Sequence, residues 1–177
     1  MEGVLRHMSE LAFAFPGVET GALALGPNPH TLTTLLPSGP HAVRTPGSFS
    51  FDPDFLNPEL NKAKRLGLQW IGVWHVHPEG SPGPSITDLS AATGLLADPE
   101  TELGGRLLMP ISERSGSSIV TRFFVAEGFP VVIRQIACAV VSGQEHTASR
   151  QGPNHQAGAP SVPQSGSNKN ANGLGSF

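Results

Sequence analysis

Residues 69–88 read QWIGVWHVHPEGSPGPSITD, and this stretch decides the fold of the chain. Its first residues are apolar almost without a break until two histidines, a pattern typical of a central strand covered on both faces. A loop rich in proline and glycine follows, and apolar residues then recur at helical spacing from Ser85 to Ala97. The stretch therefore predicts a buried strand over 69–77 and a helix over 85–97, joined by a short loop.

The segments around this stretch predict a sheet flanked by helices. Spacings of three and four between apolar residues favour a helix before Pro16, and a second helix is expected from Pro58 to Leu66. The segments with strand composition are 21–25, 31–36, 107–111, 119–126 and 131–141. This order indicates the α+β (α/β-layered) class, with a mixed, largely antiparallel β-sheet flanked by helices.

Glycine and proline are unusually frequent. The chain has 21 glycines and 17 prolines among 177 residues, nearly twice the share in average proteins. Part of this excess lies after residue 141, where only Val162, Leu174 and Phe177 are large apolar side chains. Such a segment cannot bury enough apolar surface to offset the entropy lost on ordering it. We therefore expect one folded domain over residues 1–141 and a disordered tail over residues 142–177.

The charge balance and the single cysteine narrow the class of protein. The net charge is −3 and the basic residues are scattered, which does not indicate a surface for nucleic acid or for an anionic membrane. No segment reaches the ~18–20 apolar residues of a membrane span, and the first 15 residues lack a signal-peptide core. Cys138 cannot form an intramolecular disulfide and is expected to be buried and inert. The sequence thus predicts a cytoplasmic protein without nucleic-acid or membrane partners.

The two histidines suggest metal binding. Side chains two residues apart in a strand point to the same face, so His75 and His77 can reach one metal ion. Asp88, on the first turn of the next helix, would be a third ligand, and this donor set leaves Zn²⁺ an open position for water. Simpler interpretations fit each part alone, because paired histidines can be solvated and Ser85 with Asp88 matches a helix capping box. The residues by themselves leave both interpretations open.

The combination of His-x-His-Pro at 75–78 with Ser-x-x-Asp at 85–88 resembles the JAMM motif of the JAB/MPN metalloprotease family. The family also places a glutamate at the start of an early strand, and Glu19 stands in such a context, in ETGALALG over residues 19–26. Gly21 falls one position early, and Val76 stands where the family often has serine or threonine. The motif looks like the prokaryotic JAB branch, which resembles deubiquitinase-like isopeptidases. The resemblance implies a JAB/MPN-like (cytidine-deaminase-like) fold.

This resemblance implies a zinc metallopeptidase with one Zn²⁺ per chain, on His75, His77 and Asp88. Glu19 would be the general base, and Ser85 would donate a hydrogen bond to the developing oxyanion. The bond cleaved would be the peptide or isopeptide bond after the C-terminal glycine of a ubiquitin-like protein. The implied partners are ubiquitin-like proteins or their conjugates, together with E1- and E2-like proteins of a bacterial conjugation system, some of which serve antiphage defence.

Three alternatives stay open. The first is a peptidase that trims the tail of a sulfur-carrier protein, and the second is a RadC-like JAB protein connected with DNA metabolism. The third is a non-catalytic MPN scaffold used for protein contacts. The slightly acidic charge weighs against the second, and the presence of all five motif side chains weighs against the third.

Overall fold

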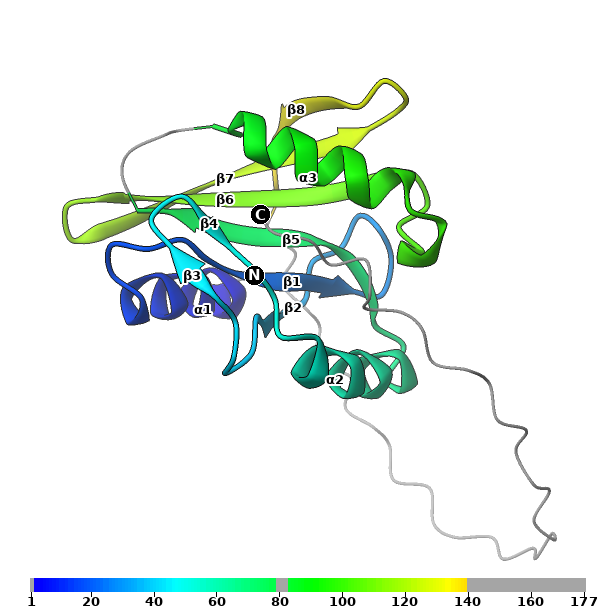
Figure 1. Cartoon of the computed structure of the whole chain (residues 1–177), viewed down its shortest axis with the longest axis horizontal. Helices are drawn as coiled ribbons and strands as arrows, with labels where there is room; N and C mark the ends of the chain where they lie inside the picture. Colours follow the sequence, from blue (N-terminus) through cyan, green and yellow to red (C-terminus); the bar gives the residue numbers. More distant parts are fainter. Residues whose placement is uncertain (1, 79–82, 140–177) are drawn as a thin grey trace, which may run out of the picture.

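A six-stranded sheet forms the centre of the fold, in the strand order β2-β1-β5-β6-β7-β8 (Figure 1). The computed structural model describes residues 2–78 and 83–139. Its elements are α1 (Glu2–Ala14), β1 (Thr20–Gly26), β2 (Thr34–Pro37), β3 (Arg44–Thr45), β4 (Ser48–Phe49), α2 (Pro53–Arg65), β5 (Gln69–His77), α3 (Ile86–Ala97), the 3₁₀ helix η1 (Pro99–Thr101), β6 (Arg106–Ser115), β7 (Ser118–Glu127) and β8 (Val132–Ile136). The predicted tail over 142–177 and residues 79–82 of the loop before α3 lie outside the described residues.

The sheet is antiparallel except at one pair of strands. β5 and β6 run parallel, whereas β1 pairs antiparallel with β2 and β5, and β7 with β6 and β8. A parallel pair needs a crossover connection, which α3 supplies. β5 is an inner strand, and every residue from Trp70 to His77 is buried. These pairings confirm the predicted α+β class, the mixed and largely antiparallel sheet, and the central position of the strand over 69–77.

Helices cover both faces of the sheet. One buried cluster joins α1 to Trp74 and Val76 of β5, and the other joins α2 and α3 to Val73 of the same strand. Successive side chains of a strand point to opposite faces, so α1 lies on one face and α2 and α3 lie on the other. Figure 1 shows α3 running along β6 and β7. His75 and His77 follow Val73 at intervals of two and therefore face the side that carries α3.

The structure differs from the sequence-based expectation at four places. α2 begins at Pro53 rather than Pro58, because the Asp52 carboxylate caps the helix by accepting from the Phe55 N–H at 3.3 Å. The hairpin of β3 and β4 lies in a segment without any periodic pattern, since each of its strands is only two residues long. β8 ends at Ile136, whereas the strand was expected to reach 141. Cys138 is exposed, so its predicted burial is wrong: it follows the end of this edge strand.

Helix length bears on the question of membranes. Among the described residues, no helix is long and apolar enough to cross a bilayer.

Candidate metal centre

The end of β5 presents two imidazoles to one side of the sheet. His75 and His77 are both buried, with 0% and 4% of their surface exposed. Between them, Val76 packs on the opposite face, in the cluster that includes α1. Trp74 lies in the same cluster, and its indole N–H donates to the Ser112 Oγ of β6 at 2.8 Å. The strand that carries the histidines is therefore held by pairing on both edges and by packing behind it.

The third side chain comes from the first turn of α3. Asp88 occupies the third position of the helix, where its backbone N–H bonds to the Ser85 Oγ at 3.1 Å. Its carboxylate accepts in turn from the Ser85 backbone N–H at 2.6 Å. This reciprocal arrangement is the capping box that the sequence predicted. Capping is compatible with metal binding, because the same geometry that closes the helix end turns the carboxylate toward the histidines.

The ligand atoms of these three residues are close together and buried. The His75 Nε2 lies 3.0 Å from the His77 Nε2 and 3.1 Å from the Asp88 Oδ1. The Asp88 Oδ2 lies 3.4 Å from the His77 Nε2. In a tetrahedral zinc site with bonds of ~2.0–2.1 Å, neighbouring ligand atoms are about 3.3 Å apart. The donor set and its spacing therefore fit a metal ion of this size, with three protein ligands and one remaining position.

The electrostatic environment keeps Asp88 ionised. Burial alone would raise the pKa of its carboxyl, but hydrogen bonds with His75 and His77, together with the backbone N–H of Ser85, outweigh burial and hold the pKa well below its usual range. A carboxylate that stays negative at all physiological pH values is ready to bind a cation. In the described part of the chain, these three residues form the cluster of His, Cys, Asp and Glu side chains that could hold a metal ion.

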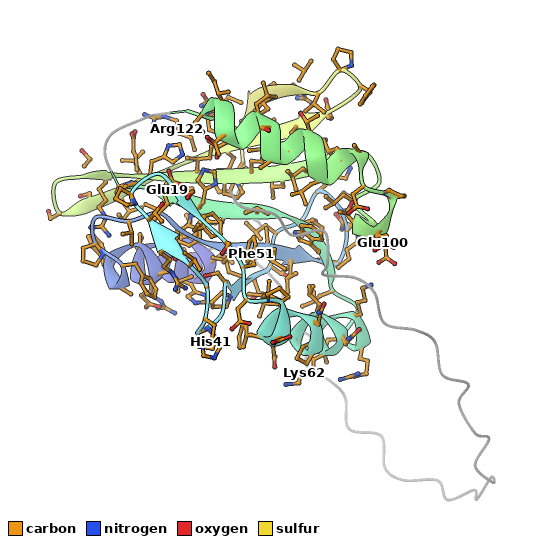
Figure 2. The ribbon with its side chains drawn as sticks, in the orientation of Figure 1. Glu19, His41, Phe51, Lys62, Glu100 and Arg122 are labelled. Atoms are coloured by element: carbon orange, nitrogen blue, oxygen red, sulfur yellow. The ribbon has the colours of Figure 1, made fainter. Side chains whose placement is uncertain are left out.

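Glu19 enters the same site from the neighbouring strand. It directly precedes β1, where Thr20 pairs with Val76 and Gly21 with His75. Its side chain is half-buried, and burial raises the pKa of the carboxyl, while His75 and His77 lower it and Asp88 raises it further. The pairing of β1 with β5 puts Glu19 beside the end of β5 that carries the two histidines. Figure 2 shows Glu19 at the end of the sheet where the β3–β4 hairpin lies.

All five residues singled out in the sequence thus converge. Glu19, His75, His77, Ser85 and Asp88 come from three separate segments and meet at one end of β5. Ser85 is exposed, unlike the three candidate ligands, so that it can be reached from solvent.

Phe49 is a side chain near the site that the sequence did not suggest. Its buried ring lies 6.3 Å from the His75 ring between centroids. It fits there because Gly21 has no side chain: a Cβ on Gly21 would lie 2.2 Å from the Phe49 Cζ and 2.6 Å from the Trp74 carbonyl oxygen. Gly21 is therefore required by close packing beside His75. The sequence showed a glycine two residues after Glu19, but it could not show that Phe49 packs against this glycine.

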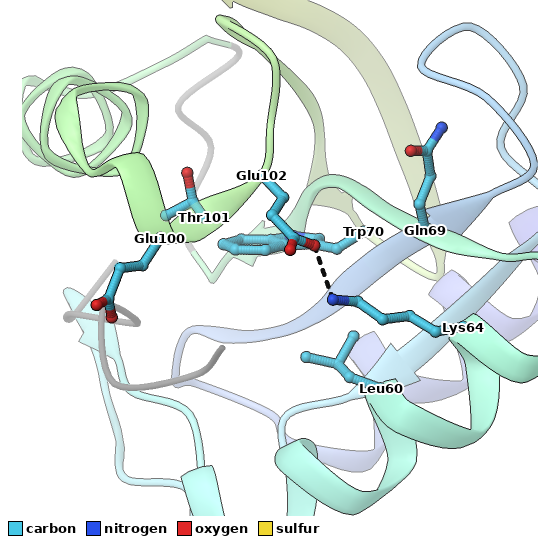
Figure 3. Close-up of a pocket in the computed structure, with 7 residues that line it drawn as sticks. All are labelled: Leu60, Lys64, Gln69, Trp70, Glu100, Thr101 and Glu102. Carbon is cyan, nitrogen blue, oxygen red and sulfur yellow. Dashed lines mark hydrogen bonds and ion pairs between the residues drawn. The ribbon is translucent and has the colours of Figure 1, made fainter. Parts of the chain in front are cut away.

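A small pocket lies at the end of β5 opposite the candidate metal centre (Figure 3). It is lined by Trp70 and bounded by the ion pair between Lys64 Nζ and Glu102 Oε2, at 2.7 Å. Its volume of about 40 Å³ has room for a few water molecules and not for a substrate. No histidine lines it. A larger open groove of about 500 Å³, which includes Ile86 and Leu89, shares Ser85 with the candidate site.

Comparisons with known proteins find similar sequences and a similar fold. The family described as prokaryotic homologs of the JAB domain matches residues 1–122. A probable metalloprotease of Sinorhizobium fredii, y4qB, is 31% identical over 107 residues, which cover 56% of this chain and 65% of the relative. The CD-NTase/cGAS isopeptidase of Enterobacter hormaechei is 32% identical over 87 residues, covering 45% of this chain and 47% of the relative. The desampylase of Haloferax volcanii is 30% identical over 93 residues, covering 52% and 67%.

The matches thus span about half to two thirds of the length of these relatives. A solved structure is also similar: the solution structure of protein DSY2949 from Desulfitobacterium hafniense has a TM-score of 0.58 and 20% identity. The match covers 85% of this chain and 94% of that one. At this identity the likeness concerns the fold alone.

Proposed function

Because this chain belongs to the family of prokaryotic homologs of the JAB domain, we propose that it is a zinc-dependent isopeptidase. Its reaction is hydrolysis of the peptide or isopeptide bond after the C-terminal glycine of a ubiquitin-like protein. The metal is Zn²⁺, one per chain, on His75, His77 and Asp88. The observation that carries the proposal is the closeness of the ligand groups: the two Nε2 atoms lie 3.0 Å apart, and the Asp88 carboxylate approaches His75 with Oδ1 at 3.1 Å and His77 with Oδ2 at 3.4 Å.

The choice of zinc follows from the donor set. Two imidazoles and one carboxylate with an open fourth position are typical of catalytic zinc sites, whereas structural sites have four protein ligands. When bound, Zn²⁺ supplies Lewis-acid activation of water near neutral pH.

Glu19 is the proton carrier in this proposal. Its carboxylate accepts a proton from the attacking water and returns it to the nitrogen of the leaving amine, so that the amide bond breaks without release of an amide anion. The raised pKa of this carboxyl suits the task, because a base whose conjugate acid is less acidic holds the proton long enough to pass it on.

Ser85 stabilises charge in this proposal. Its Oγ accepts the Asp88 backbone N–H, which fixes the oxygen and leaves the hydroxyl hydrogen able to point toward a substrate oxygen. Ser85 is exposed and lines the open groove, so a carbonyl approaching from the groove meets this hydroxyl beside the metal ligands. A hydrogen bond of this kind strengthens as negative charge develops on the carbonyl oxygen.

The names of the relatives support cleavage of protein conjugates. One is an isopeptidase and another a desampylase, and a third is named a probable metalloprotease. By extension, the proposed partners are ubiquitin-like proteins or their conjugates and the E1- and E2-like proteins of a bacterial conjugation system with a role in antiphage defence, and the proposed compartment is the cytoplasm.

Cleavage of a reporter fusion tests the function. A ubiquitin-like protein is joined through its C-terminal glycine to a fluorescent reporter, either in a linear fusion or through a lysine side chain, and its release is followed for wild type and Glu19→Ala. Removing the base is expected to lower kcat by ~10²–10⁴ while the metal is retained. Glu10→Ala is the matched control, because Glu10 is an exposed glutamate of α1. Equal rates for wild type and Glu19→Ala would remove Glu19 from the mechanism, and no release by wild type would refute the proposed activity.

A further inference from the structure

Residues of the β3–β4 hairpin contact the segment that carries Glu19 and hold it in place. The Arg44 guanidinium lies over the Phe15 ring, 4.0 Å from its centroid, and its Nε donates to the Thr20 Oγ1 at 2.9 Å. The backbone N–H of Glu19 donates to the Thr45 carbonyl at 2.8 Å. Arg44 and Thr45 thus hold the connection between α1 and β1 at three points. These points are Phe15 at its start, Glu19 at its end and Thr20 at the beginning of β1.

Arg44 is itself held in place on the other side. Its Nη1 donates to the Ala42 carbonyl at 3.0 Å, and its Nη2 donates to the Ser38 Oγ at 2.7 Å and to the Gly39 carbonyl at 3.3 Å. The planar guanidinium can make these bonds and stack on an aromatic ring at the same time, which an ammonium group cannot do. Arg44 therefore links the loop of residues 38–42 to the segment that ends in Glu19.

Glu19 needs such support, because it lies outside the regular strand. β1 begins at Thr20, and the residues from Pro16 to Glu19 form an irregular connection with Gly17 at a φ of +77°. The direction of the Glu19 carboxyl thus depends on how this connection is held. A shift of ~1 Å in a catalytic group can cost ~10²-fold in rate.

The effect of Arg44 runs through the backbone and not through its charge. The hydrogen bonds of Arg44 go to the Thr20 Oγ1, the Ser38 Oγ and the carbonyl oxygens of Ala42 and Gly39, which belong to the segments around Glu19. A lysine at position 44 would keep the positive charge and lose the fork of hydrogen bonds. Arg44→Lys is therefore expected to behave like Arg44→Ala.

From these contacts we propose that Arg44 is a positioning residue for Glu19: with Thr45, it sets the direction of the proposed general base toward the candidate metal ligands. The kinetic consequence of this inference rests on the proposed function. The effect of Arg44 on the segment that carries Glu19 can be measured without any enzymatic activity.

The first test is amide hydrogen exchange, which needs no substrate. In Arg44→Ala, exchange of the Glu19 amide is expected to speed up at least ~10-fold, because its bond to the Thr45 carbonyl opens more often. Exchange within β5 should stay as in wild type. Arg134→Ala is the matched control, since this exposed arginine of β8 pairs with Glu127 at 2.8 Å. Unchanged exchange at Glu19 would overturn the proposal.

The second test is a double-mutant cycle on the reporter fusion. Thr20→Val keeps the volume of a buried side chain and removes the oxygen that accepts from Arg44, so it serves even where Arg44→Ala fails to fold. Either substitution is expected to lower kcat ~10–100-fold, with little change in KM and with the metal retained. In a Glu19→Ala background, the same substitution should change kcat less than about twofold, since the group it positions is gone. Equal effects in both backgrounds would contradict positioning.

The two tests separate this proposal from the proposed function. If wild type releases no reporter while amide exchange at Glu19 still depends on Arg44, the proposed isopeptidase function is wrong. The role of Arg44 in holding the segment that carries Glu19 is then still supported. If wild type is active and Arg44→Ala matches it in both exchange and kcat, the positioning role fails and the function stands.

Discussion

Gly21→Ala should disturb the metal centre without touching any of its ligands. Gly21 pairs with His75 across β1 and β5, and the Phe49 ring occupies the space where a side chain would be. The new methyl group would lie 2.2 Å from the Phe49 Cζ and 2.6 Å from the Trp74 carbonyl oxygen. The ring cannot simply swing away, because it is 1% exposed and packs edge-on against Phe51 with centroids 5.2 Å apart.

The size of the effect follows from these contacts. Overpacking a core by one carbon typically costs ~1–3 kcal/mol. Here the cost should be at the upper end, because one of the atoms in the way belongs to the backbone of an inner strand. For a domain of this size, ~3 kcal/mol corresponds to a fall in Tm of about 6–12 °C. Displacement of the Phe49 ring toward His75, whose ring lies 6.3 Å away, should also weaken metal binding.

Thermal unfolding and metal content together check this prediction. Gly47→Ala is the matched control, because Gly47 lies in the same hairpin as Phe49 and a Cβ there has no atom within 4 Å. It should change stability by less than about 0.5 kcal/mol. Adding Phe49→Leu to Gly21→Ala should restore part of the lost Tm by removing the clashing ring atoms. If Gly21→Ala is as stable and as rich in metal as Gly47→Ala, the assignment of Phe49 to this position is refuted.

Further substitutions probe the site and its support. Asp88→Asn should lose nearly all bound metal after dialysis, because it removes the negative charge of the third ligand; retention of metal would show that Asp88 is not a ligand. Ser85→Ala should lower stability by ~1 kcal/mol through loss of the helix cap and should lower kcat by ~10²-fold. Ser85→Thr keeps the hydroxyl and should retain most of the stability and of kcat. If Ser85→Ala has the same kcat as wild type, Ser85 serves only as a helix cap. Trp74→Phe should lower stability by ~2 kcal/mol through loss of its buried bond to Ser112, with metal retained; an unchanged Tm would mean that the bond contributes nothing net.

The periodicity and spacing of apolar residues in the sequence predicted most of the fold. The strand over 69–77 was predicted with the bounds that β5 has, because a strand buried on both faces leaves a long apolar run. The meeting of His75, His77 and Asp88 was also predictable, since alternation in a strand and a capping position at a helix start each fix the direction of a side chain. Glu19 required the family resemblance, because nothing local connects it with a strand that begins fifty residues later.

Other features could not be predicted because they depend on contacts between distant segments. Arg44 and Phe49 lie in a hairpin of two-residue strands, which is too short to leave a periodic pattern. Their importance comes from what they touch, Thr20 in one case and the space above Gly21 in the other. Cys138 was misplaced for a related reason: an apolar run predicts burial, but the chain had already passed the end of an edge strand.

The most direct test of the proposed zinc site is the metal content of the purified chain. Elemental analysis of wild type, prepared without chelators, should find about one zinc per chain, because the three buried side chains could hold one ion. His77→Ala should abolish binding, whereas His30→Ala, which changes an exposed turn histidine, should not. Absence of zinc from wild type, or full zinc in His77→Ala, would contradict the assignment of a zinc centre to His75, His77 and Asp88.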